Sequence, residues 1–271
     1  AEFSTRLLRG EKPAMAVYAD ATDPAATGGA VSAMLDLPQL ALVHDLVGPL
    51  APLRAGAAPF ELRVHRRYNP EGLSAYNVVP GLMGVILTMT LVMMTSMAMT
   101  RERERGTLEN LLATPVRPLE MMLGKILPYV LIGYVQVLIV FAAAMGLFEV
   151  PMEGSHVLLT AAVLLFITAT LTVGFTFSTI ARSQMQSMQM TMFYFLPNIL
   201  LSGFMFPFRG MPQWAQTIGE VLPLTHFLRI VRAVMLKGAG PADIAAEAAA
   251  IGAFTLVAAG VALLRYRQTL D

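Results

Sequence analysis

The sequence predicts a mainly α-helical membrane protein, a polytopic helical bundle preceded by a small α/β region. Of the 271 residues, 56% are hydrophobic and only 14% are charged, whereas a water-facing domain carries about a quarter charged residues. The mean hydropathy is +0.62. Several uncharged stretches also reach the roughly 20 residues that a helix needs to cross a hydrocarbon core of about 30 Å.

Residues 1–76 contain no such stretch, and their pattern predicts a folded α/β region rather than a tail. Asp23 and Pro24 can start a helix, because aspartate caps a helix and proline fits its first turn. Apolar and polar side chains alternate near the end of the region, which is typical of a half-buried strand. The elements we expect are a strand at 14–19, a helical stretch over 30–50 that Pro38 interrupts, and a strand at 60–65.

Residues 77–271 predict a membrane domain with about five spans. The first four apolar stretches carry no charge. Only a few polar residues around Arg182 separate the third from the fourth, so a tight turn is required there. The last stretch is rich in alanine and contains Glu247 near one end. The expected spans are 77–100, 126–148, 157–181, 183–208 and 244–264.

Lysine and arginine in the short loops give the expected orientation, because cytoplasmic loops carry an excess of them. Five cationic residues lie within 101–125, Arg182 follows the third span, and Arg265 and Arg267 follow the last; we expect these loops to be cytoplasmic. Residues 149–156 contain two glutamates and no lysine or arginine, so we expect them outside. Residues 207–240 conflict with the rule, because they should lie outside but carry four cationic residues.

This alternation places residues 1–76 outside the cytoplasm. The first residues of the sequence contain no apolar run that could export them. We therefore expect an N-terminal anchor helix or a cleaved signal to precede them, and we favour the anchor.

Searches for catalytic and metal-binding patterns give no candidate residues. The sequence has no cysteine and no phosphate-binding G-x-x-x-x-G-K-[ST] loop, since Gly124 and Lys125 are followed by isoleucine. Its four histidines lack metal-ligand spacing, and the formal net charge of +1 gives no basic field for nucleic acid. We expect no catalytic residue, no metal and no nucleic-acid partner.

The most informative segment is 101–118, which leaves the first span with alternating charges. Leu108, Leu111 and Leu112 then share one face of a short helix that Pro115 ends. One interpretation is a helix that lies on lipid headgroups with arginines as anchors. The other is a docking helix for a cytoplasmic partner, and the physical pattern alone does not separate the two.

Residues 103–115, RERGTLENLLATP, resemble the E-R-G-T-x-E-x-L-x-x-T-P signature of ABC-2 type transporter permeases. An apolar helix starts near Gly124, as it does in that family. Further matches are RYNP at 67–70, VPG at 79–81, LSGFMFP at 201–207, MPQW at 211–214 and PLTH at 223–226. The resemblance covers roughly residues 60 to 240 and does not identify a substrate.

The resemblance implies a permease with six membrane helices, the first of them absent from this sequence, and a large extracytoplasmic domain after that helix. It also implies a dimer, homomeric or heteromeric, that works with two cytoplasmic ATPase subunits. ATP and Mg²⁺ would bind those subunits, so no cofactor is expected in this chain. Residues 207–240 resemble the family's extracytoplasmic helices. The positions that match the family's ATPase-contacting coupling helix are Glu104, Arg105, Gly106, Thr107, Glu109 and Leu112.

Polar residues inside spans are costly and often functional, and Gln136 and Asn198 are the candidates here. Each could bond to a neighbouring helix, worth about 0.6 kcal/mol on average, or could contact a substrate. Pro80, Pro128 and Pro197 should kink or break their helices.

We expect the membrane subunit of an ATP-driven exporter in the bacterial inner membrane, with a possible periplasmic adaptor as a further partner. An amphipathic substrate such as a drug or lipid-like molecule is favoured, because no charge lies in the middle of a span. Alternatives are a polysaccharide or glycolipid exporter, a secondary transporter that uses Glu247, and a non-transporting scaffold or sensor.

Overall fold

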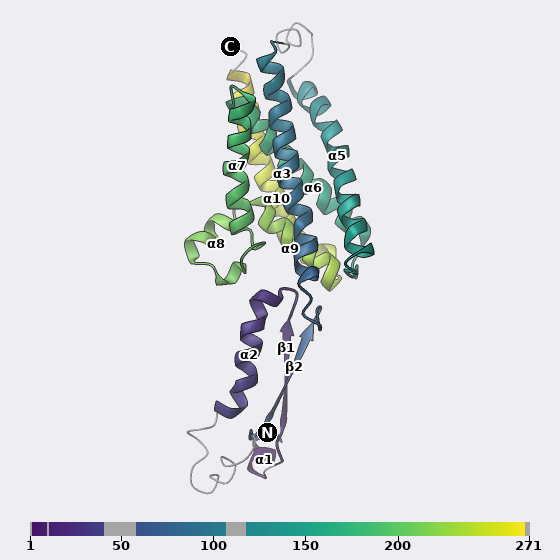
Figure 1. Ribbon diagram of the computed structural model, residues 1–271, viewed down its shortest axis with the longest axis vertical. Coiled ribbons are helices and arrows are strands. Elements are labelled where there is room, and N and C mark those ends of the chain that lie inside the picture. Colours follow the sequence, from purple (N-terminus) through teal and green to yellow (C-terminus); the bar gives the residue numbers. More distant parts are fainter. Residues whose placement is uncertain (1, 10, 41–57, 107–117, 269–271) are drawn as a thin grey trace. The chain divides into compact units, whose positions relative to one another are not determined.

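The computed structural model describes residues 2–9, 11–40, 58–106 and 118–268 (Figure 1). The chain divides into two compact units, Ala1–Ser74 and Ala75–Asp271. Each is described by itself.

The first unit contains a two-stranded parallel sheet with helices. Its elements are α1 (Glu2–Leu8), β1 (Ala14–Asp20), α2 (Pro24–Leu40) and β2 (Glu61–Arg67). β1 pairs with β2 from Ala14 opposite Glu61 to Asp20 opposite Arg67. Both predicted strands are therefore confirmed, and the parallel pairing agrees with a connection that contains a helix.

Asp23 starts α2 as predicted, because its Oδ1 accepts hydrogen bonds from the backbone N–H groups of Ala25 (3.0 Å) and Ala26 (3.2 Å). Pro24 is the first residue of the helix. The helix continues through Pro38 as far as Leu40, so the interruption expected at this proline is wrong. The remainder of the predicted 30–50 helix lies outside the described residues.

The second unit is a helical bundle (Figure 1). Its long helices are α3 (Ser74–Glu104), α5 (Pro118–Gly146), α6 (His156–Ile180), α7 (Gln184–Leu201) and α10 (Pro241–Gln268). Between α7 and α10 lie a 3-10 turn η2 (Phe208–Gly210), α8 (Gln213–Gly219) and α9 (Pro223–Lys237). Helices α3, α5 and α7 continue through Pro80, Pro128 and Pro197, so the prolines do not break them.

Four of the described helices are long and apolar enough to cross a membrane. They comprise Ser74–Glu102, Leu127–Gly146, His156–Ile180 and Pro241–Arg265. These four confirm four of the predicted spans, including the alanine-rich last one. The predicted span 183–208 is not among them, because α7 ends at Leu201 and carries three glutamines and an asparagine.

The core of the bundle lies where α6 meets α9. Residues Leu224, Phe227, Ile230 and Val234 of α9 have no exposed surface, and Phe227 stacks on Phe166 of α6 with ring centroids 4.1 Å apart. Gly174 allows α6 to approach α3 closely, because a Cβ there would come within 2.8 Å of the Val92 carbonyl oxygen. Helix α9 is thus a packed part of the bundle rather than a surface loop.

Candidate functional site

The predicted coupling residues begin at the C-terminal end of α3. Glu104 is the last residue of the helix, so the first four residues of the predicted coupling segment 101–118 prolong the first span. Arg105 and Gly106 form the turn that follows, and Gly106 has φ +69°. This left-handed conformation favours glycine and commonly ends a helix. Thr107, Glu109 and Leu112 lie outside the described residues.

Glu104 binds the first residue of α7. One carboxylate oxygen accepts a hydrogen bond from the Gln184 backbone N–H (2.8 Å), and the other accepts one from the Gln184 side-chain amide. These bonds, from the side chain first and the backbone second, lower the pKa of Glu104. Arg101 donates to the amide oxygen of Gln184 at 3.3 Å. The glutamate is therefore charged at neutral pH and faces the N-terminus of α7.

A group of buried hydroxyls continues this contact along the two helices. Ser96 and Thr100 of α3 lie one turn apart, and both reach the Ser187 hydroxyl of α7, at 2.6 Å and 2.9 Å. All three residues have no exposed surface. Ser96, Thr100 and Glu104 follow one another at intervals of four residues on α3, a helical spacing that could have indicated a shared contact surface in the sequence. These three residues form, with Gln184 and Ser187 of α7, a contact that we call the α3–α7 seam.

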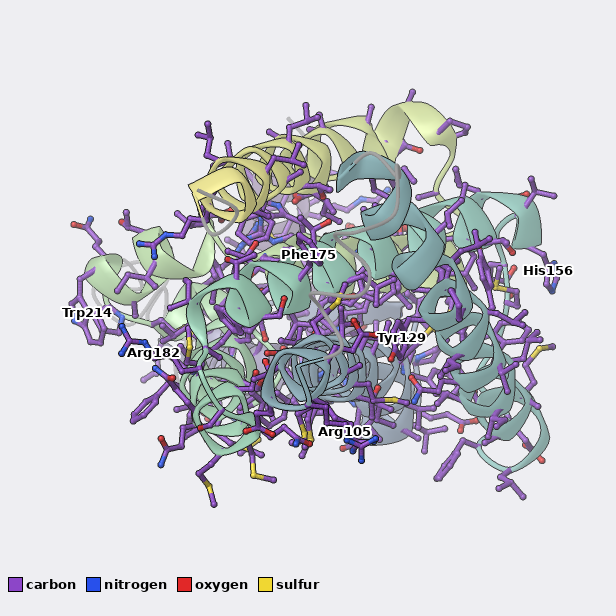
Figure 2. All side chains as sticks on the ribbon, turned by 90° about the horizontal axis from the view of Figure 1, so that it is seen from above. Arg105, Tyr129, His156, Phe175, Arg182 and Trp214 are labelled. Carbon is purple, nitrogen blue, oxygen red and sulfur yellow. The ribbon has the colours of Figure 1, made fainter. Side chains whose placement is uncertain are left out.

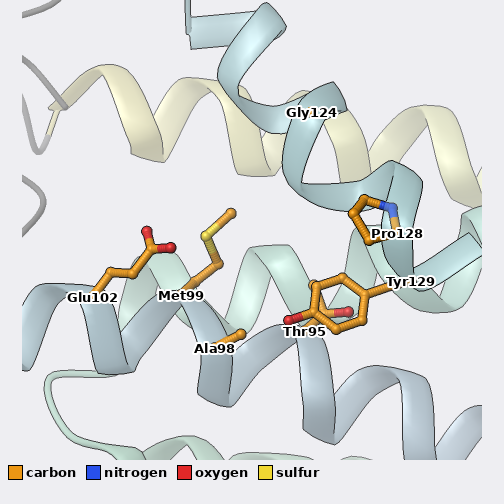
Figure 3. Close-up of a pocket in the computed structure, with 7 residues that line it drawn as sticks. All are labelled: Thr95, Ala98, Met99, Glu102, Gly124, Pro128 and Tyr129. Carbon is orange, nitrogen blue, oxygen red and sulfur yellow. The ribbon is translucent and has the colours of Figure 1, made fainter. Parts of the chain in front are cut away.

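A cavity of about 260 Å³ lies between α3 and α5, next to the predicted coupling segment. Figure 3 shows Tyr129 of α5 lying near Thr95 of α3, with the carboxylate of Glu102 further along the same helix. The Thr95 hydroxyl is buried and has no hydrogen-bond partner among the described residues. The lining residues are Thr95, Ala98, Met99, Glu102, Gly124, Pro128 and Tyr129.

Gln136 and Asn198 have different surroundings. The Thr90 hydroxyl of α3 donates to the amide oxygen of Gln136 at 2.9 Å, which makes a bond between helices. Asn198 is fully buried, and its amide nitrogen donates to the Tyr194 carbonyl within α7 at 2.8 Å. Its amide oxygen has no hydrogen-bond partner among the described residues. Gln136 thus joins α3 to α5, whereas Asn198 keeps one free acceptor.

Comparison with known proteins decides the family. The model of the ABC-2 family transporter proteins matches residues 1–264. This chain belongs to the ABC-2 transporter family. The assignment agrees with the motif after α3 and with the apolar helices of the second unit.

Several relatives in Escherichia coli K12 are named as permeases. The probable multidrug ABC transporter permease YbhS is 31% identical over 205 residues, which is 75% of this chain and 54% of the relative. YbhR, named in the same way, is 32% identical over 66% of this chain and 49% of the relative. The inner membrane transport permease YhhJ is 33% identical over 99% and 71%. The matches with YbhS and YbhR thus span about half of those relatives' length.

The other end of this ABC-2 bundle carries a charge cluster that the sequence analysis missed. His226 of α9 contacts the Glu247 carboxylate of α10 through Nδ1, and its Nε2 lies 2.8 Å from the Glu220 carbonyl oxygen. Arg229 bridges the two carboxylates, at 2.6 Å from Glu220 and 3.3 Å from Glu247. The hydrogen bond from Arg229 is the main cause that lowers the pKa of Glu220. His226 and Arg229 are three residues apart on α9, but Glu247 lies 18 residues after Arg229 on another helix, so no spacing rule joins it to them.

Within the second unit, loops that we expect on the same side of the membrane lie at the same end of the bundle. The backbone N–H of Glu153, in the α5–α6 loop, donates to the Met235 carbonyl of α9 at 2.9 Å. At the opposite end the last turn of α3 meets the first turn of α7. Figure 2, which looks down on the molecule, shows Arg105, Arg182, His156 and Trp214 at the edge of the bundle and Phe175 within it.

Among the described residues, no group of three histidine, cysteine, aspartate or glutamate side chains is placed to hold a metal ion. The contacts of His226 and Arg229 with Glu220 and Glu247 make the charge cluster an ion-pair network that joins α9 to α10.

Proposed function

We propose that this chain is part of the membrane-spanning permease of an ABC exporter that a separate cytoplasmic ATPase subunit drives. The observation that carries this proposal is the position of Glu104, Arg105 and Gly106, the start of the E-R-G-T segment, at the end of α3 in a chain of the ABC-2 family. ATP and Mg²⁺ bind the ATPase subunit, and this chain contributes the coupling segment through which closure of the ATPase moves the spans.

The substrate we propose is an amphipathic small molecule or lipid-like molecule that leaves the cytoplasm or the inner leaflet. The cavity between α3 and α5 supports this, because Met99 and Pro128 offer apolar surface while Glu102 and Tyr129 carry polar groups. Apolar surface with a few polar groups is typical of small-molecule sites. The relatives YbhS and YbhR are named as probable multidrug permeases, which favours the same substrate class.

The proposed assembly contains a second permease subunit, a pair of ATPase subunits and the lipid bilayer, with a periplasmic adaptor as a further candidate. Helix α7 is less apolar than the four candidate spans, so we assign it as a fifth span that faces the translocation path or the second subunit rather than lipid. In this topology residues 1–76 and the segment 207–240 lie outside the cytoplasm, and the protein is in the bacterial inner membrane.

The experiment that tests this function is co-purification of the full-length permease with its candidate ATPase subunit. Glu109→Lys is the variant of choice, because Glu104 is engaged with Gln184 and its replacement would also disturb α7. We expect the wild-type permease to retain the ATPase and Glu109→Lys to lose it. Glu149→Lys is the matched control, because it makes the same charge reversal on an exposed residue in the α5–α6 loop, at the other end of the bundle.

The outcomes separate the candidate functions. Loss of the ATPase from Glu109→Lys but not from Glu149→Lys, with both variants eluting as folded protein, supports a coupling segment. Failure of the wild-type permease to bind any candidate ATPase under conditions where both are folded rejects the exporter and returns a membrane scaffold or sensor to first place.

A further inference from the structure

The seam between α3 and α7 has one feature that the proposed coupling segment leaves unexplained. Helix α7 has no acidic residue in its own first turn, although a negative charge there stabilises the free N–H groups of a helix N-terminus. Glu104, from the end of α3, supplies that charge by accepting bonds from both N–H donors of Gln184.

The side-chain amide of Gln184 also has a cationic partner on α3. Arg101, one turn before Glu104, donates to the oxygen of the same Gln184 amide. The amide of Gln184 is therefore held between an anion and a cation of a single helix turn. Two charge-assisted hydrogen bonds, one to each end of the amide, fix the orientation of the Gln184 side chain better than either bond alone.

Next to the Glu104–Gln184 contact, hydrogen bonds among the buried hydroxyls of Ser96, Thr100 and Ser187 join α3 to α7. Serine and threonine allow helix backbones to approach and bond across the interface in membranes. The seam thus extends over two turns of α3, from Ser96 to Glu104, and ends where the E-R-G-T segment begins.

We propose that Glu104 is a positioning residue that ties the start of α7 to the end of α3, so that both helices move as one element when the coupling segment is displaced. This inference rests on the proposed function, because it assumes that an ATPase displaces the segment. It gives Glu104 a role different from the direct ATPase contact that the family resemblance implies.

The first test measures the seam without weakening it. Spin labels are placed at Met94→Cys on α3 and Met188→Cys on α7, both of which are exposed. The 271 residues contain no other cysteine, and any cysteine in the rest of the full-length protein is first replaced by serine. The full-length permease in lipid nanodiscs with its ATPase is measured with and without ATP and vanadate. We expect one narrow distance distribution that is the same in both states. A distance that changes with nucleotide overturns the proposal, because the helices would then move separately.

The second test separates positioning from contact. In Glu104→Gln and Gln184→Ala we expect the ATPase to remain bound, while the change in ATP hydrolysis that the permease causes falls by a factor on the order of ten. Gln184→Ala keeps the backbone N–H that donates to Glu104, so we expect it to be the milder of the two. The double variant should lose less than the sum of the two single variants, since both weaken one contact. Gln189→Ala, an exposed glutamine on the same helix, should behave as wild type.

Loss of ATPase binding in Glu104→Gln but not in Gln184→Ala overturns the proposal and makes Glu104 a contact residue. Equal behaviour of Gln184→Ala and Gln189→Ala also overturns it. Failure of the wild-type permease to bind any ATPase rejects the proposed function instead. The nucleotide-free distance then still reports whether Gln184→Ala loosens the seam, so the two failures are distinguishable.

Discussion

Glu247 illustrates how a charge in a membrane helix can be paired with residues of a neighbouring helix. It is the residue that a secondary transporter would need for ion coupling, yet its carboxylate contacts both His226 and Arg229 of α9. Removing one partner of a buried charge pair is destabilising, because the other charge is then left uncompensated. The network fastens the segment between α7 and α10 to the last helix.

We predict that Glu247→Ala lowers the free energy of unfolding by about 1–3 kcal/mol, because it leaves His226 and part of Arg229 without their partner. The measurement is thermal denaturation of the purified permease in detergent. Glu247→Gln, which keeps the shape and one acceptor oxygen, should lose less. Glu149→Ala, on an exposed loop residue, should change nothing, and equal losses in all three would contradict this account.

The free amide oxygen of Asn198 leads to a prediction of the opposite sign. Asn198→Leu removes a buried acceptor that has no partner among the described residues, so we expect unchanged or higher stability, by up to about 1 kcal/mol. Gln136→Leu breaks the bond to Thr90 and should cost about 0.6 kcal/mol. Thermal melting of both variants measures this. A clearly destabilised Asn198→Leu would show that its oxygen has a partner in the assembled protein.

At the scale of helices, the close approach of α3 and α6 depends on one missing side chain. A Cβ at Gly174 would lie 2.8 Å from the Val92 carbonyl oxygen and 2.9 Å from the Thr95 Cβ. Neither neighbour is the free end of a flexible side chain, so the helices themselves would have to separate.

We therefore predict that Gly174→Ala destabilises the bundle by about 1–3 kcal/mol through overpacking. Gly252→Ala on α10 is the matched control, because nothing lies within 4 Å of its Cβ position, and alanine there favours the helix by up to about 1 kcal/mol. The fraction of monodisperse protein after heating compares the two. Equal tolerance of both changes would contradict a tight contact between α3 and α6.

The sequence predicted most elements but not how they associate. Apolar length and alternation were enough for both strands and for four spans, because these signals are local. The end of α7 was misplaced, since the apolar residues after Leu201 continue the hydropathy signal while the backbone leaves the helix. The pairing of Glu104 with Gln184, 80 residues apart, and of His226 with Glu247 depends on tertiary packing, which no local pattern encodes.

At the scale of the whole molecule, two of the four cations in 207–240 that conflict with the expected orientation have partners within the fold. The positive-inside rule counts lysine and arginine in short loops near the ends of spans, whereas long segments cross the membrane largely regardless of charge. In the segment 207–240, Arg229 is paired with Glu220 and Glu247, and Arg232 donates to the Gly203 carbonyl at 3.3 Å. These arginines are used within the fold, so they carry little weight against an outer location.

The proposed topology therefore predicts the accessibility of single cysteines introduced into the full-length protein. Ser32→Cys in the first unit and Gln213→Cys at the start of α8 are exposed positions that should react with a membrane-impermeant maleimide in intact spheroplasts. Arg182→Cys, exposed between α6 and α7, should react only after the membrane is opened. The reason is that three spans, α3, α5 and α6, lie between Ser32 and Arg182, and one, α7, lies between Arg182 and Gln213. An odd number of spans places two positions on opposite sides of the membrane.

If Arg182→Cys and Gln213→Cys react alike in intact spheroplasts, α7 does not cross the membrane and the fifth span is wrong. If Ser32→Cys is protected while Gln213→Cys reacts, the first unit is cytoplasmic, and α3 would then have to begin on the same side as the coupling segment that follows it.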